Sequence, residues 1–406
     1  MTSMLRRQIH TVSRIGRRGY STVAPRAFSD EKGITISWPD NRQTRFHHEY
    51  LLDHCRCPRC FHPVTKQRLK TLVDFDPTVR PEELVSYDDR VVIKWPDDHS
   101  SEFPFTILER AAYNPPLKRL RREEPYLWTS DIAQSPPTME HDEVTAQGID
   151  GERAVLKWLD LIAKYGFCFL QGVPANPEAT ERAIRRIAPI RETHYGGFWD
   201  FTANMAHGDL AYSNQALPAH TDTTYFTDPA GLQIFHLLSH EGAGGSSLLV
   251  DGFFAASQLS PSAYVTLSRL GVPSHASGSP GTILRPMSRP SLIHDDQGHL
   301  VQVRWNNEDR GVIGPGWTAE DVESWYAAAR ELEQVNRSPA AEYWKQLEPG
   351  TMVVIDNWRV MHGRSAFTGS RRMCGAYIGA DDWRSRRAAL RTNLEGVNDS
   401  IWDFGW

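Results

Sequence analysis

The sequence has little of what marks a membrane protein, a nucleic-acid-binding protein or a disulfide-rich protein. Its 406 residues contain no apolar run that approaches the roughly 20 residues needed to cross a bilayer. The net charge is −5, without the basic excess typical of nucleic-acid binders. Five cysteines are too few for a disulfide scaffold in a chain of this length. We therefore expect neither a membrane nor a nucleic acid as a partner.

Acidic residues are missing from the start of the chain, where Asp30 is the first and six arginines precede it. An Arg-rich, acid-free segment with many small residues is typical of a mitochondrial transit peptide, and an exposed basic tail is the alternative. We predict a transit peptide over 1–30 and a location in the mitochondrial matrix. Cleavage near Tyr20–Ser21 would remove five arginines and change the net charge from −5 to −10.

Two stretches resemble each other, TISWPDNRQTRF at 35–46 and VIKWPDDHSSEF at 92–103. Each runs from an alternating apolar strand through Trp-Pro-Asp into a second extended piece, and a helix-like stretch follows each. We predict a small α+β domain over 31–112. The Pro-rich and charged residues 113–149 are expected to connect this domain to a larger one, 150–406, and partly to lie against the larger one.

Short apolar runs dominate the larger domain between residues 230 and 380. They are separated by Gly, Pro and Asp, which predicts the short strands of a β-sandwich or jelly roll. Helices are expected at about 150–165, where four apolar residues between Val155 and Ile162 recur at helical spacing, and at 319–335. The fold class is therefore expected to be mainly β with helices.

Three of the five cysteines are crowded together, at Cys55, Cys57 and Cys60. Three thiolates on one tight loop suit tetrahedral zinc, and three free cysteines without metal are the alternative. The fourth ligand is either His62, which is close in sequence but would strain one loop, or His99, which comes from the second repeat and would tie both repeats together. A structural zinc site is the prediction.

A second group of metal-ligating residues begins with His220-Thr221-Asp222 in LPAHTDTTYF. In a strand, residues two apart point to the same face, so the imidazole and the carboxylate can converge. His362 in DNWRVMHGR would complete the two-histidine, one-carboxylate triad of non-haem Fe(II) oxygenases, which leaves three coordination positions open. An isolated His-x-Asp is weak evidence, because such pairs are often ordinary surface or core contacts.

Arg371 and Arg372 strengthen this interpretation, because they follow His362 on the next predicted strand. A buried arginine there could hold a dicarboxylate through its planar guanidinium group. Adjacent strand residues face opposite ways, so only one of the two should enter the site. The combination suits an oxygenase that depends on 2-oxoglutarate.

Two long segments, AYSNQALPAHTDTTYFTDPAGLQIFHLLSHEGAGGSSLLVDGF and IDNWRVMHGRSAFTGSRRMCGAY, closely resemble the γ-butyrobetaine hydroxylase family of Fe(II)/2-oxoglutarate-dependent oxygenases. The resemblance covers essentially everything after residue 33, and HTDTTYF and NWRVxHGRxxFTG are nearest to the branch that acts on trimethyllysine. It implies a double-stranded β-helix (jelly-roll) catalytic domain preceded by a small α+β zinc-binding domain, with a mitochondrial setting and a homodimer.

The resemblance also implies roles for individual residues. The iron ligands are expected to be His220, Asp222 and His362. The 2-oxoglutarate carboxylate is expected to bind Arg371, with a further hydrogen bond from Ser247, whereas Arg364 is expected to form a structural ion pair. For zinc, the resemblance favours Cys55, Cys57, Cys60 and His99.

Aromatic residues ahead of the metal motif match the cage with which this family encloses a trimethylammonium group. These are Tyr195, Trp199 and Tyr212, with Tyr377 expected to complete the cage. Aromatic faces attract a quaternary ammonium through their quadrupoles, although ordinary core packing is the alternative. Asp209 is expected to attract an α-ammonium group, with a surface turn residue as the alternative. Of the adjacent Asn306 and Asn307, we expect Asn307 to contact the amino-acid end.

The activity that the resemblance implies is hydroxylation of N6,N6,N6-trimethyl-L-lysine at C3, with release of succinate and CO₂, as the first step of carnitine biosynthesis. Fe(II) and 2-oxoglutarate would be required, and ascorbate would help by returning stray Fe(III) to Fe(II). Three alternatives remain open from the sequence: γ-butyrobetaine hydroxylation by the same residues, a non-catalytic reader of methylated lysine, and a zinc-dependent module that binds a protein partner.

Overall fold

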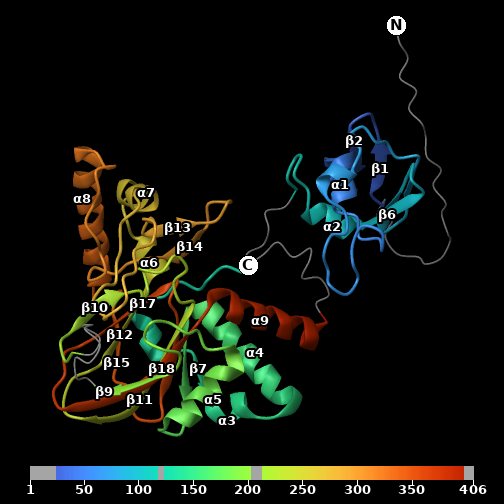
Figure 1. Ribbon diagram of the computed structural model, residues 1–406. Helices are drawn as coiled ribbons and strands as arrows, with labels where there is room; N and C mark the ends of the chain where they lie inside the picture. Colours follow the sequence, from blue (N-terminus) through green and yellow to red (C-terminus); the bar gives the residue numbers. More distant parts are fainter. Residues whose placement is uncertain (1–23, 118–122, 203–212, 397–406) are drawn as a thin grey trace. The chain divides into compact units, whose positions relative to one another are not determined.

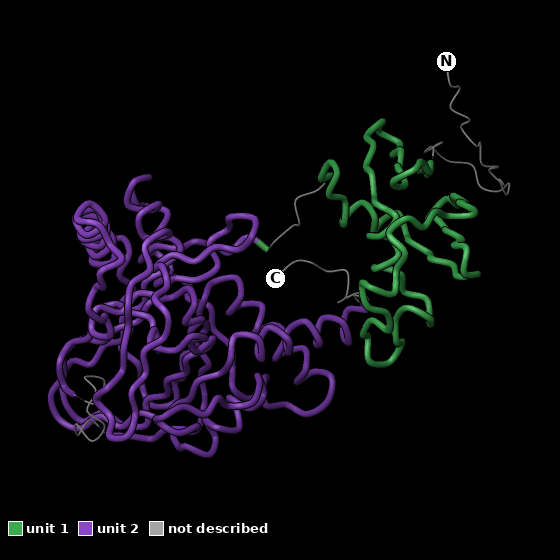
Figure 2. Tube along the Cα trace, turned by 45° about the horizontal axis from the view of Figure 1, so that its top comes forward, with its two compact units in different colours: residues 1–123, 399–406 green, residues 124–398 purple. Residues whose placement is uncertain are grey.

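The computed structural model describes residues 24–117, 123–202 and 213–396. The described residues form two compact units, divided between Glu123 and Glu124 (Figure 2). Two of the predicted substrate contacts, Asp209 and Tyr212, lie outside the described residues. Among the described helices, none combines the length and the apolarity that a membrane crossing requires.

The first unit contains two three-stranded antiparallel sheets, each followed by a short helix (Figure 1). The first sheet and helix are β1 (Arg26–Ser29), β2 (Gly33–Ser37), β3 (Gln43–His47) and α1 (His48–Asp53). The second set, which follows the short helix η1 (Leu72–Asp74), is β4 (Glu83–Ser86), β5 (Arg90–Trp95), β6 (His99–Pro104) and α2 (Phe105–Arg110).

The two similar sequence stretches form matching hairpins, β2–β3 and β5–β6. In each hairpin a buried tryptophan donates from its indole nitrogen to a hydroxyl on the returning strand. Trp38 donates to Thr44 at 3.4 Å, and Trp95 donates to Ser101 at 2.9 Å. The sequence predicted that each of the two stretches forms a strand, a turn, a second strand and a helix, and this prediction is confirmed.

Strand β1 lies inside the range 1–30 that was predicted as a transit peptide. It pairs antiparallel with β2, and its Ala27 is buried in the core of the first unit. Cleavage near Tyr20–Ser21 would leave this strand in the fold, whereas cleavage after residue 30 would remove it. Of the two positions, only the earlier one leaves the β1–β2 pairing intact.

The second unit is built on two sheets. The six-stranded sheet has the order β7-β8-β16-β11-β18-β9, and the four-stranded sheet has the order β10-β17-β12-β15. The strands of the first are β7 (Thr138–Glu140), β8 (Phe167–Gln171), β9 (Trp199–Thr202), β11 (Leu232–Glu241), β16 (Met352–Asp356) and β18 (Ser370–Ile378). Those of the second are β10 (Leu217–His220), β12 (Ser247–Asp251), β15 (Tyr343–Lys345) and β17 (Val360–Arg364).

Helices and a small hairpin complete the second unit. The helices are η2 (Ser130–Gln134), α3 (His141–Thr145), α4 (Gly148–Tyr165), α5 (Pro177–Ile187), α6 (Gly252–Ser257), α7 (Pro261–Arg269), α8 (Ala319–Asn336) and α9 (Ala380–Glu395). The hairpin is β13 (Leu292–His294) and β14 (Leu300–Val303). Helices α4 and α8 confirm the two helices predicted from apolar spacing, whereas α9 was not predicted.

Alternation along the strands separates a helix-facing side from a cavity-facing side in the six-stranded sheet. On β11, Leu232 and Ile234 pack in a buried cluster with α4, α5 and α9 (Figure 1). The intervening Gln233 and Phe235 line a cavity of about 140 Å³. Helices α6, α7 and α8 pack in the same way against the four-stranded sheet.

The predicted connection 113–149 is divided between the units, since residues from Glu124 onwards belong to the second. Trp128 is buried there, and its backbone N–H donates to Asp251 at 3.1 Å. Strand β7 pairs in parallel with β8 at the edge of the six-stranded sheet. This part of the segment is therefore integral to the larger unit.

Candidate active site

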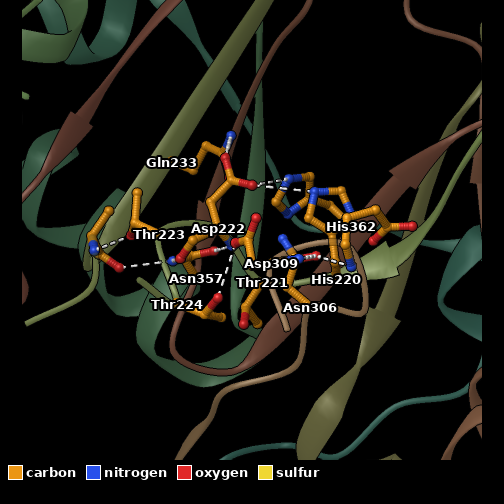
Figure 3. A network of polar contacts seen from close by, with 12 residues as sticks. His220, Thr221, Asp222, Thr223, Thr224, Gln233, Asn306, Asp309, Asn357 and His362 are labelled. Carbon is orange, nitrogen blue, oxygen red and sulfur yellow. Dashed lines mark hydrogen bonds and ion pairs between the residues drawn. The ribbon is translucent and has the colours of Figure 1, made fainter. Parts of the chain in front are cut away.

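His220, Asp222 and His362 converge at one end of the cavity (Figure 3). His220 ends β10 and is the direct cross-strand partner of His362 on β17. Asp222 lies in the turn after β10, so the turn, and not strand alternation, brings its carboxylate to the histidines. Its Oδ1 lies 3.2 Å from His220 Nε2 and 3.6 Å from His362 Nε2. The three ligand atoms lie within 4.8 Å of one another.

The protonation of these three groups is strongly coupled. Burial would raise the pKa of Asp222, but the imidazoles of His362 and His220 hold it well below its usual range. Burial lowers the pKa of His220, yet the Asp222 carboxylate outweighs this effect and raises it to about 9. Burial and the neighbouring His220 lower the pKa of His362 to about 3. Asp222 is therefore ionised, and its buried negative charge requires a positive charge close by, either a protonated His220 or a cation.

A divalent cation fits this donor set. His220 Nδ1 donates to the Pro218 carbonyl at 2.8 Å, which leaves Nε2 as the nitrogen directed at Asp222. Two imidazole nitrogens and one carboxylate oxygen then face a common point, which is the arrangement that non-haem iron prefers. A metal ion bound there would supply the positive charge beside Asp222 and leave its remaining coordination positions to the cavity.

A cavity of about 140 Å³ extends from this cluster between the two sheets. Arg371 and Ser247 line it. Arg371 is only 6% exposed, and its Nε has no hydrogen-bond partner among the described residues. Burial and the nearby Arg364 lower its pKa to about 10. A buried guanidinium without a carboxylate partner fits an anionic ligand.

The other two arginines are placed differently. Arg372 faces away from the cavity and forms an exposed pair with Asp200, its Nε lying 2.9 Å from Oδ1. Arg364, for which we expected an ion pair, is buried, lines the cavity and donates to the carbonyls of Ser213 and Gln215. It holds the chain that follows the undescribed segment 203–212.

Aromatic side chains line the cavity that also contains His220, Asp222 and His362. Of the predicted cage residues, Tyr195, Trp199 and Tyr377 are present there. Tyr225 was missed, although it stands in the HTDTTYF motif, and its hydroxyl lies 3.2 Å from that of Tyr195. The Trp199 ring lies so close to Gly375 that a Cβ there would be 2.4 Å from it. A glycine at 375 is therefore needed to seat the indole.

A turn after β14 supplies polar groups at the cavity. Asn306 lines the cavity, and its Oδ1 accepts from the backbone N–H groups of Glu308 and Asp309, which line it as well. The prediction for Asn307 is not matched by this geometry, because Asn307 is exposed and lines a smaller neighbouring cavity instead. Asn306 lines both cavities, so of the two asparagines it is the one that reaches the main cavity.

The cysteine cluster lies wholly in the first unit. Cys55, Cys57, Cys60 and His99 bring four ligand atoms within 4.8 Å of one another. His99 Nε2 lies 3.1 Å from the Cys55 sulfur and 3.3 Å from the Cys60 sulfur. His62 accepts backbone N–H groups of its own loop through Nδ1. Burial and the neighbouring thiols raise the pKa of Cys60 to about 12, so thiolates at this place need a cation such as zinc.

Comparison with known proteins covers both units. A family model described as taurine catabolism dioxygenase TauD, TfdA family, matches residues 131–377, and one described as γ-butyrobetaine hydroxylase-like, N-terminal, matches residues 26–109. Trimethyllysine dioxygenase of Neurospora crassa is 39% identical, with 89% of this chain and 85% of that protein covered. The chain belongs to the trimethyllysine dioxygenase family. Its second unit accordingly has a TauD-type oxygenase fold, mainly β with helices.

More distant relatives place the chain within the wider group. The human protein named mitochondrial trimethyllysine dioxygenase is 35% identical, with 86% of each chain covered. The human γ-butyrobetaine dioxygenase is 28% identical, with 90% of this chain and 96% of that protein covered. The chain is thus more similar to both of these trimethyllysine dioxygenases than to that γ-butyrobetaine dioxygenase.

Proposed function

We propose that the protein hydroxylates N6,N6,N6-trimethyl-L-lysine at C3, consuming O₂ and 2-oxoglutarate and releasing succinate and CO₂. The observation that carries this proposal is one cavity that joins a two-histidine, one-carboxylate cluster, a buried arginine whose Nε has no hydrogen-bond partner among the described residues, and an aromatic wall. Membership of the trimethyllysine dioxygenase family supports the choice of substrate. The reaction would be the first step of carnitine biosynthesis.

His220, Asp222 and His362 would hold Fe(II), and ascorbate would keep the iron reduced. Arg371 would hold the distal carboxylate of 2-oxoglutarate, with a hydrogen bond from Ser247. The bound iron and 2-oxoglutarate supply the activation of O₂ and the oxidation of a C–H bond. We interpret the two sheets around this site as the walls of a jelly roll, the double-stranded β-helix.

The remaining cavity residues orient the substrate. Tyr195, Trp199 and Tyr377 would enclose the trimethylammonium group, which cannot donate a hydrogen bond but is attracted to aromatic faces. Asp209 would pair with the α-ammonium, and Tyr212 would add a wall to the cage. Fixing both ends of the substrate places C3 beside the metal, which is the positional part of catalysis.

Substrate-dependent release of succinate tests the proposal. The purified protein, supplied with Fe(II), ascorbate and 2-oxoglutarate, is incubated separately with trimethyllysine and with γ-butyrobetaine, and the hydroxylated product is located by mass spectrometry. We expect hydroxylation of trimethyllysine at C3 and little turnover of γ-butyrobetaine. Faster turnover of γ-butyrobetaine would support the rival hydroxylase, and binding of trimethyllysine without succinate would support a reader.

The other assignments complete the proposal. Structural zinc in the first unit would be bound by Cys55, Cys57, Cys60 and His99. The sequence-based boundaries of 31–112 for the zinc-binding domain and 150–406 for the oxygenase domain are adjusted to the structure: we propose a transit peptide that ends before β1, a zinc-binding domain that includes β1, and an oxygenase domain that begins at Glu124. Import into the mitochondrial matrix is supported by the Arg-rich start and by the name of the human relative. A homodimer remains an expectation from the family.

A further inference from the structure

Asp222 lies between two cross-strand pairs that belong to different sheets. In the four-stranded sheet, His220 and His362 are direct partners. In the six-stranded sheet, Gln233 on β11 and Tyr377 on β18 are direct partners as well. All four side chains line the same cavity, and Figure 3 shows the Asp222 carboxylate between Gln233 and the two histidines.

The two carboxylate oxygens of Asp222 have different partners. Oδ1 faces the histidines, at 3.2 Å from His220 and 3.6 Å from His362. Oδ2 accepts a hydrogen bond from the Gln233 amide and another from the Tyr377 hydroxyl, the latter at 2.7 Å. The Gln233 amide must direct its NH₂ at Asp222, because its oxygen would be repelled by the carboxylate.

The donors are well placed to hold the carboxylate firmly. Gln233 is 2% exposed and Tyr377 is 7% exposed, so water competes little for either bond. Gln233 Oε1 has no hydrogen-bond partner among the described residues. Leaving a buried amide oxygen unpaired costs free energy, about 1–3 kcal/mol, which simple core packing by an apolar side chain would avoid.

The backbone of Asp222 is held independently by Asn357, from the turn between β16 and β17 (Figure 3). The Asn357 side chain accepts from the Asp222 N–H at 2.7 Å and donates to the Asp222 carbonyl at 3.0 Å. A further bond runs from Asn357 to the Ala230 carbonyl at 2.9 Å. With the main chain fixed, rotation of the carboxylate is the remaining freedom, and Gln233 and Tyr377 remove it.

We propose that Gln233 and Tyr377 are positioning residues that restrict Asp222 to binding the metal through Oδ1 alone. A carboxylate can ligate through one oxygen or both, and the second oxygen would occupy a position that 2-oxoglutarate or O₂ needs. Two hydrogen bonds on Oδ2 disfavour the two-oxygen mode. This inference rests on the proposed function, since it requires a metal at the cluster, and it adds a role for Tyr377 beyond a cage wall.

The test compares Gln233→Met and Tyr377→Phe with the wild-type full chain. Both variants remove a donor at nearly constant volume, and Tyr377→Phe keeps the aromatic ring. The matched controls are Gln302→Met and Tyr343→Phe, which change a buried glutamine and a buried tyrosine that do not line this cavity. Iron is removed with a mild chelator that leaves thiolate-bound zinc in place, and thermal unfolding verifies that each variant folds.

Mn(II) affinity, measured by the electron paramagnetic resonance signal of the free ion, is the first readout. Loss of an outer partner of a metal ligand weakens binding by roughly 10–100-fold, and we expect this range for each site variant and no change for the controls. The second readout is the visible charge-transfer absorption of Fe(II) with 2-oxoglutarate in the absence of O₂. It should weaken in the site variants, because a two-oxygen Asp222 competes with the chelating oxo acid.

The outcomes separate this inference from the proposed function. Site variants that bind Mn(II) and develop the absorption as the wild type does would overturn the inference. A Tyr377→Phe protein with unchanged metal affinity but a raised KM for trimethyllysine would limit Tyr377 to the cage and contradict its positioning role. If the wild-type protein itself failed to bind Mn(II), the proposed function would be the one contradicted.

Discussion

Arg371 and Arg372 are neighbours in sequence but lie in different environments. Arg371 is buried and lines the same cavity as the three candidate iron ligands, whereas Arg372 pairs with Asp200 at the surface. Because successive strand residues point to opposite faces, the direction of β18 alone assigns one guanidinium to the site and the other to solvent. Both residues are arginines, so the direction in which each side chain leaves the strand decides whether it can take part in the site.

Substitution of Arg371 tests this assignment. Under the proposed function, Arg371→Ala would remove a charge-assisted bond to the distal carboxylate of 2-oxoglutarate, which is worth about 1.5–3 kcal/mol. We expect KM for 2-oxoglutarate to rise by roughly ten- to a hundredfold. Arg372→Ala is the matched control and should leave KM near the wild-type value. A rise in KM with Arg372→Ala alone would show that the strand faces the other way in solution.

Strand β11 shows how one element serves both the site and the core. Gln233 and Phe235 face the cavity, whereas Ile234 and His236 face the helices. The buried His236 Nδ1 lies 2.7 Å from the Thr180 hydroxyl of α5, and its Nε2 accepts from the Gly350 N–H at 3.2 Å. The imidazole is therefore a neutral link between the sheet and its covering helix.

The stability of the protein should depend on pH through His236. Burial, with a smaller effect of His141, lowers its pKa to about 4 in the folded state, against about 6.5 in the unfolded chain. Below pH 6.5 the unfolded chain binds a proton that the folded one does not. The free energy of unfolding is therefore not reduced by His236 above pH 6.5. As the pH falls from 6.5 towards 4, protonation of His236 in the unfolded chain lowers it by on the order of 3 kcal/mol.

Urea unfolding of the full chain between pH 7 and pH 4.5 measures this effect. We expect His236→Gln to have a shallower decline of unfolding free energy with falling pH than the wild type. His299→Gln is the control, because that histidine is only half-buried and makes its contact with Asp295 at the surface. Equal slopes for wild type and His236→Gln would show that another group carries the acid sensitivity.

A buried ion pair and its carbonyl contacts connect β12, α4, the segment around Tyr126 and the turn between β16 and β17. Arg359, 2% exposed, binds Asp251 through two contacts of 3.0 and 2.7 Å and also donates to the carbonyls of Tyr126 and Lys164. Arg359→Met should lower the free energy of unfolding by about 3–5 kcal/mol, because the Asp251 charge stays buried without its partner.

A surface pair provides the comparison for Arg359. Arg337→Met breaks the exposed contact with Glu333 on α8 and should cost less than about 1 kcal/mol. Chemical denaturation of both variants, with the wild type, gives the difference. A loss below 1 kcal/mol for Arg359→Met would indicate that the backbone N–H groups of Trp128 and Phe253, which donate to the Asp251 carboxylate, compensate for the missing guanidinium.

At the scale of the whole molecule, each compact unit carries its own cluster of metal-ligating side chains. The cluster in the first unit has three cysteines and a histidine, and the cluster in the second has two histidines and a carboxylate. A complete four-ligand set of thiolates and imidazole is typical of structural zinc, whereas a three-ligand set keeps positions for reactants. The donor set in the first unit thus suits a structural metal, and that in the second suits a metal that takes part in a reaction.

Metal content and stability of the first unit test this division. We expect one zinc per chain, lost with Cys57→Ser and weakened by His99→Ala, and thermal stability should fall with the metal because binding and folding are coupled at such sites. His62→Ala is the control, since its imidazole contacts its own loop. Loss of zinc with His62→Ala and its retention with His99→Ala would assign the fourth ligand to the local loop.

Patterns local in the sequence were sufficient to predict much of the architecture. The apolar spacing of Val155 and its neighbours predicted α4, and the paired Trp-Pro-Asp stretches predicted the repeated hairpins. Helix α9 was missed, because it is largely polar and only Ala380, Trp383 and Leu390 of its 16 residues are buried. The integration of residues 124–149 into the larger unit was also not predictable in full, since it depends on contacts with distant chain.

The sequence by itself determined the residue types of both clusters, their family resemblance and the alternation that lets only one of two arginines face inward. Only the tertiary structure decided which residues meet. The opposite positions of His220 and His362, and of Gln233 and Tyr377, follow from strand register, which joins residues more than 100 positions apart. Asn306, Tyr225 and Asn357 acquire their places at the site in the same way. Such pairings are set by the packing of two sheets around a common interior, and no local pattern encodes that packing.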